Sequence, residues 1–290
     1  LQTGERAAGD RDERSRHLKT HDTGLRGHRL DPFDFSHSRN PSIYDPNKIP
    51  LVLLHVLGAG VGYWSNNIAA FGSQRPTYAL DLFGFGQSER IRAFPDCADT
   101  AEEWFVKLVE EWRVAMGIEK MILLGHRLGG YVAASYAPLA ISTQNRNLGL
   151  NVCPRNPRAA FQYLHQVDAD HPTGEIVYSK LSHNNWATNP MNKRILDLDS
   201  SVPISFLLSD HGNQPLEEVV RTTRCWRKER NMFTIIQHIR SGTRPNVQNP
   251  AAFNNDVLVI CKIVDFNTDQ RVFPFDDHQH NHASIKRKAQ

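Results

Sequence analysis

Short apolar runs, separated by stretches with helical periodicity, recur through the middle of this chain. The runs are flanked by glycine-bearing loops and do not alternate between apolar and polar positions, which is typical of strands buried on both faces of a parallel sheet. We expect strands at residues 49–55, 77–82, 121–124, 204–208 and 233–236.

Helical patterns lie between several of these runs. The clearest covers residues 102–116, where large apolar side chains recur at helical spacing. Asp99 or Thr100 could cap this helix at its N-terminus. Strands that alternate with helices predict a mostly parallel central sheet flanked by helices, with right-handed crossovers.

The pattern also divides the chain. Residues 1–40 are polar and charge-mixed, so we expect a disordered or loosely attached arm. Prolines interrupt the pattern from 155 to 200, where a short cap or lid is expected, and the apolar pattern ends after residue 265. We therefore predict the arm at 1–40, the N-terminal part of the core at 41–154, the reduced cap at 155–200, the C-terminal part of the core at 201–265 and a polar tail at 266–290.

Composition narrows the function classes. The net charge of +3 over 290 residues is small, so it gives little support to an anionic partner, and we expect no nucleic acid. The four cysteines form no CxxC pair, which favours free thiols in a reducing, cytoplasmic compartment. The longest apolar run, 51–64, is too short to span a bilayer, so membrane contact would be peripheral. The alternating histidines at 278–282 are interpreted as incidental, and no metal or cofactor is expected.

The sequence LLGHRLGG at residues 123–130 has the form of a nucleophile elbow, a sharp turn between a strand and a helix. Glycines allow this turn because neighbouring β-carbons would collide. A serine is expected at its centre, but the chain has Arg127, whose guanidinium stays protonated and cannot attack a carbonyl. The residues of the predicted elbow are Gly125, His126, Arg127, Gly129 and Gly130.

Two loops could support acyl chemistry beside this turn. The loop after the first strand would supply one oxyanion-hole N–H, from Val56 or Leu57, and Leu128 would supply the second. Val56 stands where a glycine is expected, and its branched side chain disfavours the backbone angles that glycine allows. Ser88, in the loop 81–88, is a conceivable nucleophile, although a serine at this place is normally structural.

Five strings together resemble the abhydrolase-domain family of lysophospholipases and lipid-droplet lipase coactivators. They are LVLLH at 51–55, GVGYW at 60–64, DLFGFGQS at 81–88, EEWR at 110–113 and MILLGH at 121–126. The resemblance implies an α/β-hydrolase fold and a lipid or acyl-glycerol ligand. It also implies a place at the lipid-droplet surface, with a triglyceride lipase or a droplet coat protein as partner.

Hydrolytic members of this family use a serine, an acid and a histidine, and these match the chain poorly. The nucleophile falls on Arg127. Asp210 is the acid nearest the expected place, and His238 is a displaced candidate base. The histidine belongs just before Asn249, where residues 241–245 read SGTRP.

Three interpretations follow from these departures. The first is a catalytically impaired protein of lipid metabolism that binds lipid and regulates or coactivates a triglyceride lipase. The second is an active hydrolase or acyltransferase on lysophospholipid or acylglycerol, with a rearranged site that uses Ser88, His126, Asp210 and His238. The third is a damaged relative without function. In the first, Arg127 either binds a carboxylate or phosphate bidentately or extends out of a defunct pocket.

Overall fold

A seven-stranded sheet forms the centre of the part of the chain that can be described. The computed structural model describes residues 32–34, 45–88, 90, 94–136, 140–143, 173–184, 186–194, 202–209, 221 and 234–270. Within these residues the strand order is β1-β3-β2-β4-β5-β8-β9. The strands are β1 (Pro32–Asp34), β2 (Leu51–Leu54), β3 (Thr77–Leu80), β4 (Ile122–His126), β5 (Ala140–Thr143), β8 (Ile204–Ser209) and β9 (Thr234–Ile239).

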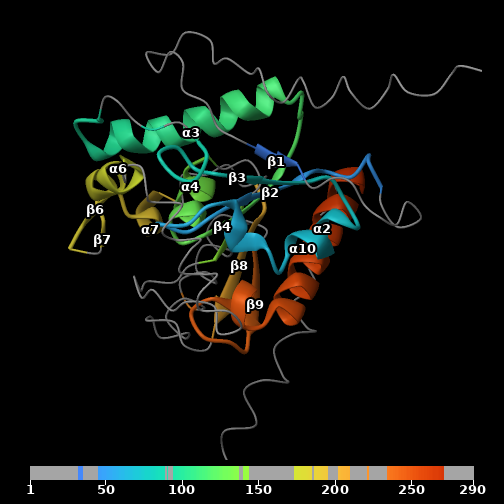
Figure 1. Cartoon of the computed structure of the whole chain (residues 1–290). Coiled ribbons are helices and arrows are strands. Elements are labelled where there is room, and N and C mark those ends of the chain that lie inside the picture. Colours follow the sequence, from blue (N-terminus) through green and yellow to red (C-terminus); the bar gives the residue numbers. More distant parts are fainter. Residues whose placement is uncertain are drawn as a thin grey trace, which may run out of the picture.

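All neighbouring strands pair in parallel except β1, which pairs antiparallel with β3 at the edge. Helices cover both faces of the sheet (Figure 1). They are η1 (Val61–Trp64), α2 (Ile68–Gly72), α3 (Ala98–Ala115), α4 (Leu128–Tyr136), α6 (Thr173–Leu181), α7 (Met191–Arg194), α9 (Pro245–Gln248) and α10 (Pro250–Gln270), with a small hairpin of β6 (Ser182–His183) and β7 (Trp186–Ala187). No helix among the described residues has both the length and the apolar character needed to cross a membrane.

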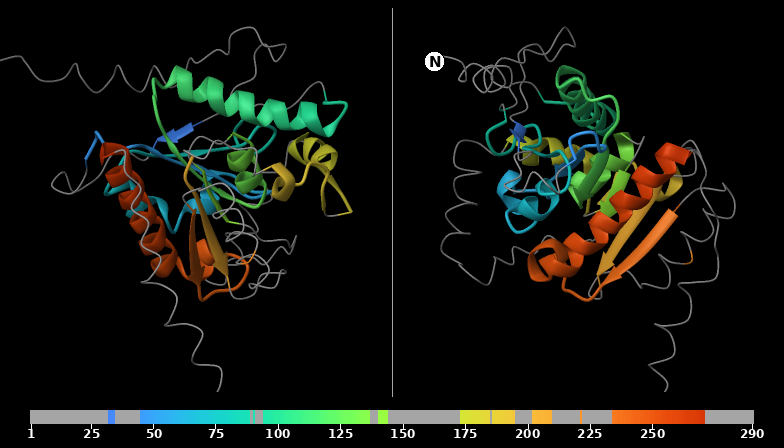
Figure 2. Two further views of the ribbon diagram at one scale, coloured as in Figure 1. Left: turned by 180° about the vertical axis from the view of Figure 1, so that it is seen from behind. Right: turned by 90° about the vertical axis from the view of Figure 1, so that its right-hand side faces the viewer.

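The two faces of the sheet carry separate cores, which explains why the strands do not alternate. Val52, Leu54 and Leu123 pack against α3, α4 and α6 on one face. Leu51 and Leu53 pack against α2 and α10 on the other face. The views in Figure 2 show the same layering, with α3 and α10 on opposite sides of the strands. A strand buried on both faces must be apolar at every position, and β2 is fully buried along its length.

Several boundaries differ from those that the sequence predicts. Residues 32–34, within the predicted arm, form β1. Helix α3 begins earlier than expected, and its N-cap is Cys97, while Asp99 lies in the first turn. Helix α10 continues to Gln270, past the predicted start of the tail. These differences arise because edge pairing and helix extension depend on contacts with other elements rather than on local apolar periodicity.

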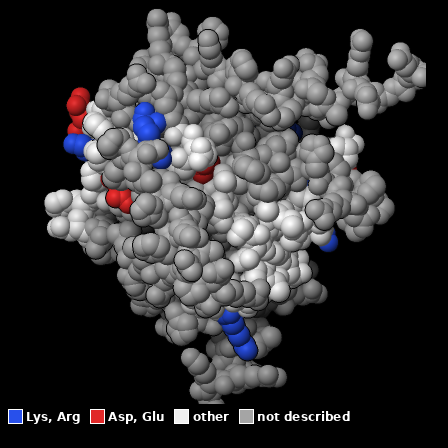
Figure 3. Space-filling model, in the orientation of Figure 1, with Lys and Arg blue, Asp and Glu red and all other residues white. Residues whose placement is uncertain are grey.

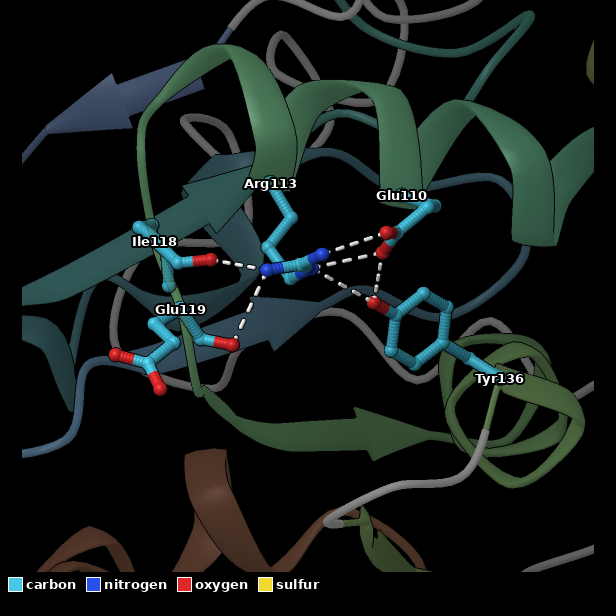
Figure 4. Close-up of polar contacts among 5 residues, drawn as sticks. All are labelled: Glu110, Arg113, Ile118, Glu119 and Tyr136. Carbon is cyan, nitrogen blue, oxygen red and sulfur yellow. Dashed lines mark hydrogen bonds and ion pairs between the residues drawn. The ribbon is translucent and has the colours of Figure 1, made fainter.

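Arg113 joins the end of α3 to the segment that leads into β4 (Figure 4). Its guanidinium donates to both carboxylate oxygens of Glu110, at 2.7 and 2.6 Å, and to the Tyr136 hydroxyl on α4 at 3.1 Å. It also donates to the carbonyls of Ile118 and Glu119. The Arg113 hydrogen bonds hold the pKa of the Glu110 carboxyl below its usual range. This partly exposed pair adds little stability, but it ties both flanks of β4 to α3.

The described elements between β5 and β8 are joined to the core in part through Glu102 of α3. Arg194 of α7 forms an ion pair with this carboxylate, and the Tyr131 hydroxyl on α4 donates to it at 2.5 Å. The N–H of Gly174 on α6 donates to the Gly84 carbonyl at 3.2 Å. Elements from the predicted cap therefore pack beside the start of α4.

Two glycines allow β4, α4 and β2 to approach one another closely. A Cβ on Gly125 would lie 2.1 Å from the Gly129 carbonyl oxygen, and a Cβ on Gly129 would lie 2.2 Å from the Leu54 carbonyl oxygen. The atoms in the way belong to the backbone, which cannot move aside without shifting a strand or a helix. The turn between β4 and α4 therefore requires glycine at both positions.

Gly129→Ala is expected to lower the free energy of unfolding by about 3 kcal/mol, because the new methyl group forces α4 away from β2. The measurement is chemical denaturation of both proteins. Gly117→Ala is the control: φ is +67° there but nothing lies within 4 Å, so only backbone strain of about 1 kcal/mol is expected. If both variants lost the same free energy of unfolding, the close backbone approach at Gly129 would not account for the loss.

Candidate functional site

Arg127 occupies the turn between β4 and α4. Its φ of 53° is in the left-handed region, which side chains other than glycine and asparagine rarely adopt. The Arg127 carbonyl accepts the N–H of Tyr131 at 2.8 Å, so α4 begins directly after the turn. A strained residue between a strand and a helix is the backbone geometry of a nucleophile elbow, here with an arginine at its centre.

The guanidinium of Arg127 is incompletely paired in the part of the chain that the structure describes. Its Nε and Nη2 atoms are buried and make no hydrogen bond to any described residue. Burial is the main cause that lowers the pKa of Arg127, and the nearby charge of Arg244 lowers it further. The phenols of Tyr63 and Tyr178 act in the opposite direction and raise the pKa of Arg127. In the described part of the chain, no carboxylate is among the groups that shift this pKa.

The loop after β2 packs directly on the start of α4. The Gly129 N–H donates to the His55 carbonyl at 3.1 Å. His55 is buried: its Nε2 accepts the Leu82 N–H at 2.8 Å, and its Nδ1–H donates to the Val56 carbonyl at 2.8 Å. These partners require the neutral ring with the proton on Nδ1, and burial lowers the pKa of His55 accordingly. His55 is therefore a structural support of the loop.

The predicted oxyanion donors lie at this contact. The Val56 carbonyl also accepts the Ala59 N–H at 3.2 Å. Within the described residues, the N–H groups of Leu57 and Leu128 have no hydrogen-bond acceptor. Glu175 of α6 faces the same loop, with Oε1 3.8 Å from the point where a Cβ on Gly58 would lie.

Ser88 lies in the loop that follows β3, and its hydroxyl is bound within that loop. Its hydroxyl donates to the Asp81 carbonyl at 2.6 Å, and the residue is buried. The Asp81 carboxylate accepts the N–H groups of Val61 and Gln87, at 2.7 and 2.8 Å. The side chains of Ser88 and Asp81 are therefore structural groups that hold the loop together. The geometry gives no support to a nucleophilic role for Ser88.

The loop after β9 reaches the elbow and is fixed there by a buried network. His126 Nδ1–H donates to the Tyr63 hydroxyl at 2.9 Å, and that hydroxyl donates to Asn246 Oδ1 at 2.9 Å. Asn246 Nδ2 donates to the Tyr63 carbonyl at 3.3 Å, which sets the orientation of the amide. Asn67 Nδ2 donates to the Asn246 carbonyl at 2.9 Å. The network joins η1, β4 and α9.

Electrostatics keep this network neutral. Burial is the main cause that lowers the pKa of His126 to about 3, and the charges of Arg127 and Arg244 add to it. Burial also raises the pKa of Tyr63, against the influence of the same two arginines. His126 is therefore an uncharged ring at neutral pH. Since it holds the elbow to the loop after β9, its role in the described network is positional.

Catalytic roles for His238 and Asp210 stay predictions. His238 belongs to β9, where it pairs with Leu208, and the loop that reaches the elbow contains no histidine. Asp210 lies outside the described residues. No group of three or more histidine, cysteine or acidic residues in the described part of the chain could hold a metal. Sequence reasoning missed Tyr63, Arg244 and Asn246, because their partners are far away along the chain.

Comparisons with known proteins give the same fold that the strand order and the elbow indicate. A family model described as alpha/beta hydrolase fold matches residues 49–148. The chain belongs to the abhydrolase-domain family of lipid-metabolism proteins.

Among its relatives, the human (lyso)-N-acylphosphatidylethanolamine lipase is 47% identical over 281 residues, covering 76% of this chain and 81% of that protein. The human 1-acylglycerol-3-phosphate O-acyltransferase ABHD5 is 28% identical over 299 residues, covering 82% of this chain and 83% of that protein. A thermophilic esterase from Thermogutta terrifontis, 17% identical, matches with a TM-score of 0.62 over 86% of this chain and 98% of its own, which shows the shared fold.

Arg127→Gly is expected to raise the free energy of unfolding by about 1 kcal/mol, because glycine adopts φ near +53° without strain. Chemical denaturation measures the change. Ala133→Gly, in the middle of α4, is the control and should lower the same quantity by about 1 kcal/mol. Destabilisation by Arg127→Gly would mean that the arginine makes a favourable contact that outweighs its backbone strain.

Stability should fall as the pH drops below about 6.5. His126 has a folded-state pKa of about 3, so between pH 6.5 and 3 the unfolded chain binds a proton that the folded protein excludes. We expect a loss of about 2 kcal/mol from this group between pH 7.5 and pH 5, and no contribution above pH 7. Urea denaturation at several pH values tests this. His126→Asn keeps a donor for Tyr63 and should reduce the slope, although His55 still contributes; an unchanged slope would contradict the assignment.

Proposed function

We propose that this protein binds lipid without serine-dependent turnover and acts as a regulator or coactivator of a triglyceride lipase. The observation that carries the proposal is Arg127 at the centre of the elbow, because a protonated guanidinium cannot form an acyl-enzyme. The immobilised hydroxyl of Ser88 and a loop after β9 without a histidine support it further.

The lipid class is inferred from the relatives. One is named as a lipase for (lyso)-N-acylphosphatidylethanolamine and another as an acyltransferase for 1-acylglycerol-3-phosphate. We propose a ligand of the same kind, an acyl chain joined to a glycerol or phosphate head. The protein would meet it on a cytoplasmic lipid-droplet surface, together with a lipase or a droplet coat protein.

An acyl hydrolase or acyltransferase is the second candidate function. It is favoured by the N–H group of Leu128, directly after the elbow residue, and by that of Leu57 in the loop that packs on α4; neither has an acceptor among the described residues. Two such donors stabilise the oxyanion of an acyl-transfer transition state. This function would need a nucleophile other than the residue at the elbow.

We expect purified protein to show no labelling by a fluorophosphonate probe and no release of fatty acid from lysophospholipid. Added to a triglyceride lipase on a lipid emulsion, it should increase fatty-acid release. The human (lyso)-N-acylphosphatidylethanolamine lipase serves as the positive control for turnover. Labelling or turnover that disappears in Ser88→Ala would contradict the proposal and favour the second function. A cooperative thermal transition in the same preparation separates both from a damaged chain that does not fold.

A further inference from the structure

The small hairpin of β6 and β7 and the short helix α7 lie beside α6 and the start of α4 (Figure 1). We refer to β6, β7 and α7, with residues 188–190 between them, as the strap. One end is attached to α6, because the Thr188 N–H donates to the Leu181 carbonyl at 2.8 Å. Leu181 and Val177 of α6 belong to the core on that face of the sheet, whereas none of the strap side chains that the structure describes belongs to either core. The described docking of the strap therefore relies on polar contacts.

These polar contacts lie near the starts of α3 and α4. Asn189 Nδ2 donates to Asp99 Oδ1 at 2.5 Å, and the Asn189 carbonyl lies 3.2 Å from the Tyr131 hydroxyl. Arg194 Nη1 donates to Glu102 Oε2 at 2.8 Å, and its Nη2 forms an ion pair with Oε1. The contact between Asn189 and Asp99 is exposed, so water competes with it. The pair of Arg194 and Glu102 is better shielded.

The Glu102 carboxylate joins three elements. Its side chain is 10% exposed, against 41% for that of Arg194. The Tyr131 hydroxyl on α4 donates to Glu102 Oε2 at 2.5 Å, so one carboxylate on α3 binds both α4 and the strap. Burial alone would raise the pKa of Glu102, but hydrogen bonds from Arg194 and Tyr131 hold this pKa below its usual range. Because a shielded carboxylate that loses its cation is strongly destabilised, docking of the strap depends on the Glu102–Arg194 pair.

Exposed charges near the strap add little to its docking. On the face seen in Figure 3, acidic and basic side chains of the described residues gather at the left-hand edge, where Figure 1 places α6 and the start of α3. Ion pairs between exposed side chains contribute little stability, because water and salt screen them. Among the described contacts, the strong anchor of the strap is therefore the one at Glu102.

This anchor lies one helical turn from the elbow. The Tyr131 N–H donates to the Arg127 carbonyl at 2.8 Å, while the hydroxyl of the same residue donates to Glu102. On α6, Val177 is buried in one cluster with Leu128, which directly follows the elbow residue, and Leu57 packs against that cluster. The strap and α6 therefore border the elbow on one side.

Building on the ligand-binding function proposed above, we propose that the strap closes the site beside the elbow and that Glu102 is the latch residue that keeps it closed. Release of Arg194 from Glu102 undocks the strap, while α6 stays in place through Val177 and Leu181. A segment held by few contacts opens locally at a much smaller cost than global unfolding. The ligand enters and leaves while the strap is undocked, so the latch controls the rate of ligand exchange rather than the affinity.

Hydrogen exchange followed by mass spectrometry tests the latch without a ligand. Glu102→Gln and Arg194→Gln should each raise the exchange rates of the strap amides by about tenfold or more, while those of β2 and β4 stay as in the wild type. The double variant should exchange no faster than either single variant, because both substitutions remove the same pair. Arg194→Lys keeps the charge but not the planar fork, so it should restore slow exchange only in part.

Glu110→Gln is the matched control, because Glu110 stands in a second cluster built from the same groups (Figure 4). Glu110 lies on the same helix as Glu102, pairs with Arg113 and accepts the hydroxyl of Tyr136 on α4. Since Arg113 belongs to α3 itself, removal of this carboxylate leaves the strap docked. The strap of Glu110→Gln should exchange at the wild-type rate. Thermal unfolding of each variant shows whether the fold is retained.

Stopped-flow fluorescence with an NBD-labelled monoacylglycerol then tests the closure. The association and dissociation rate constants should both rise about tenfold in Glu102→Gln, because both steps pass through the undocked strap, and the dissociation constant should change little. A merely structural role for Glu102 would instead raise the dissociation rate alone and weaken binding at equilibrium.

Distinct results would overturn each part of this assignment. Strap exchange at the wild-type rate in folded Glu102→Gln and Arg194→Gln would show that Glu102 is not the latch. Faster strap exchange with unchanged ligand rates, or with a faster dissociation alone, would show that the strap does not close the site. Failure of the wild-type protein to bind the labelled monoacylglycerol would contradict the proposed function and the closure with it, whereas the exchange rates still decide whether Glu102 docks the strap.

Discussion

The close backbone contact between the start of α4 and the loop after β2 governs the rest of the site. Gly129 donates to the His55 carbonyl at 3.1 Å, and a Cβ on Gly129 would lie 2.2 Å from the Leu54 carbonyl oxygen. This contact involves main-chain atoms and glycines only, so it does not depend on which side chain stands at residue 127. A hydrolase turn can therefore keep its shape after its serine is replaced, provided that the glycines remain.

The sequence predicted the parts of the fold that have a local signature. The strands β2 and β4 were recognisable because both of their faces are buried, and the elbow because glycines flank Arg127 on both sides. Edge strand β1 was missed because three residues paired with β3 leave no local pattern. The Tyr63 network was missed because its partner Asn246 lies 183 positions away along the chain. Catalytic roles for Asp210 and His238 rested on chain order alone, and His238 belongs to a strand.

The comparisons establish the family and the fold, while the residue at the elbow bears on the chemistry. The same architecture is shared with an esterase at 17% identity, so the fold does not identify an activity. The relative at 47% identity is named as a lipase, yet the nucleophile position here is an arginine. Activity in this family must therefore be argued from the groups around the turn, which among the described residues include Arg127, the neutral His126 and the N–H group of Leu128.

A permanent cation changes the kind of ligand that this site favours. An oxyanion hole accelerates acyl transfer because its donors meet a charge that appears only in the transition state. In the proposed function, Arg127 would instead attract an anion that is already present in the ground state, and binding of that kind lowers the free energy of the bound ligand without lowering the barrier to its reaction. In the function proposed above, the replacement that removes the nucleophile would also shift the site from turnover toward retention of an anionic ligand. Both consequences follow from one side chain, held at φ 53° by glycines on either side.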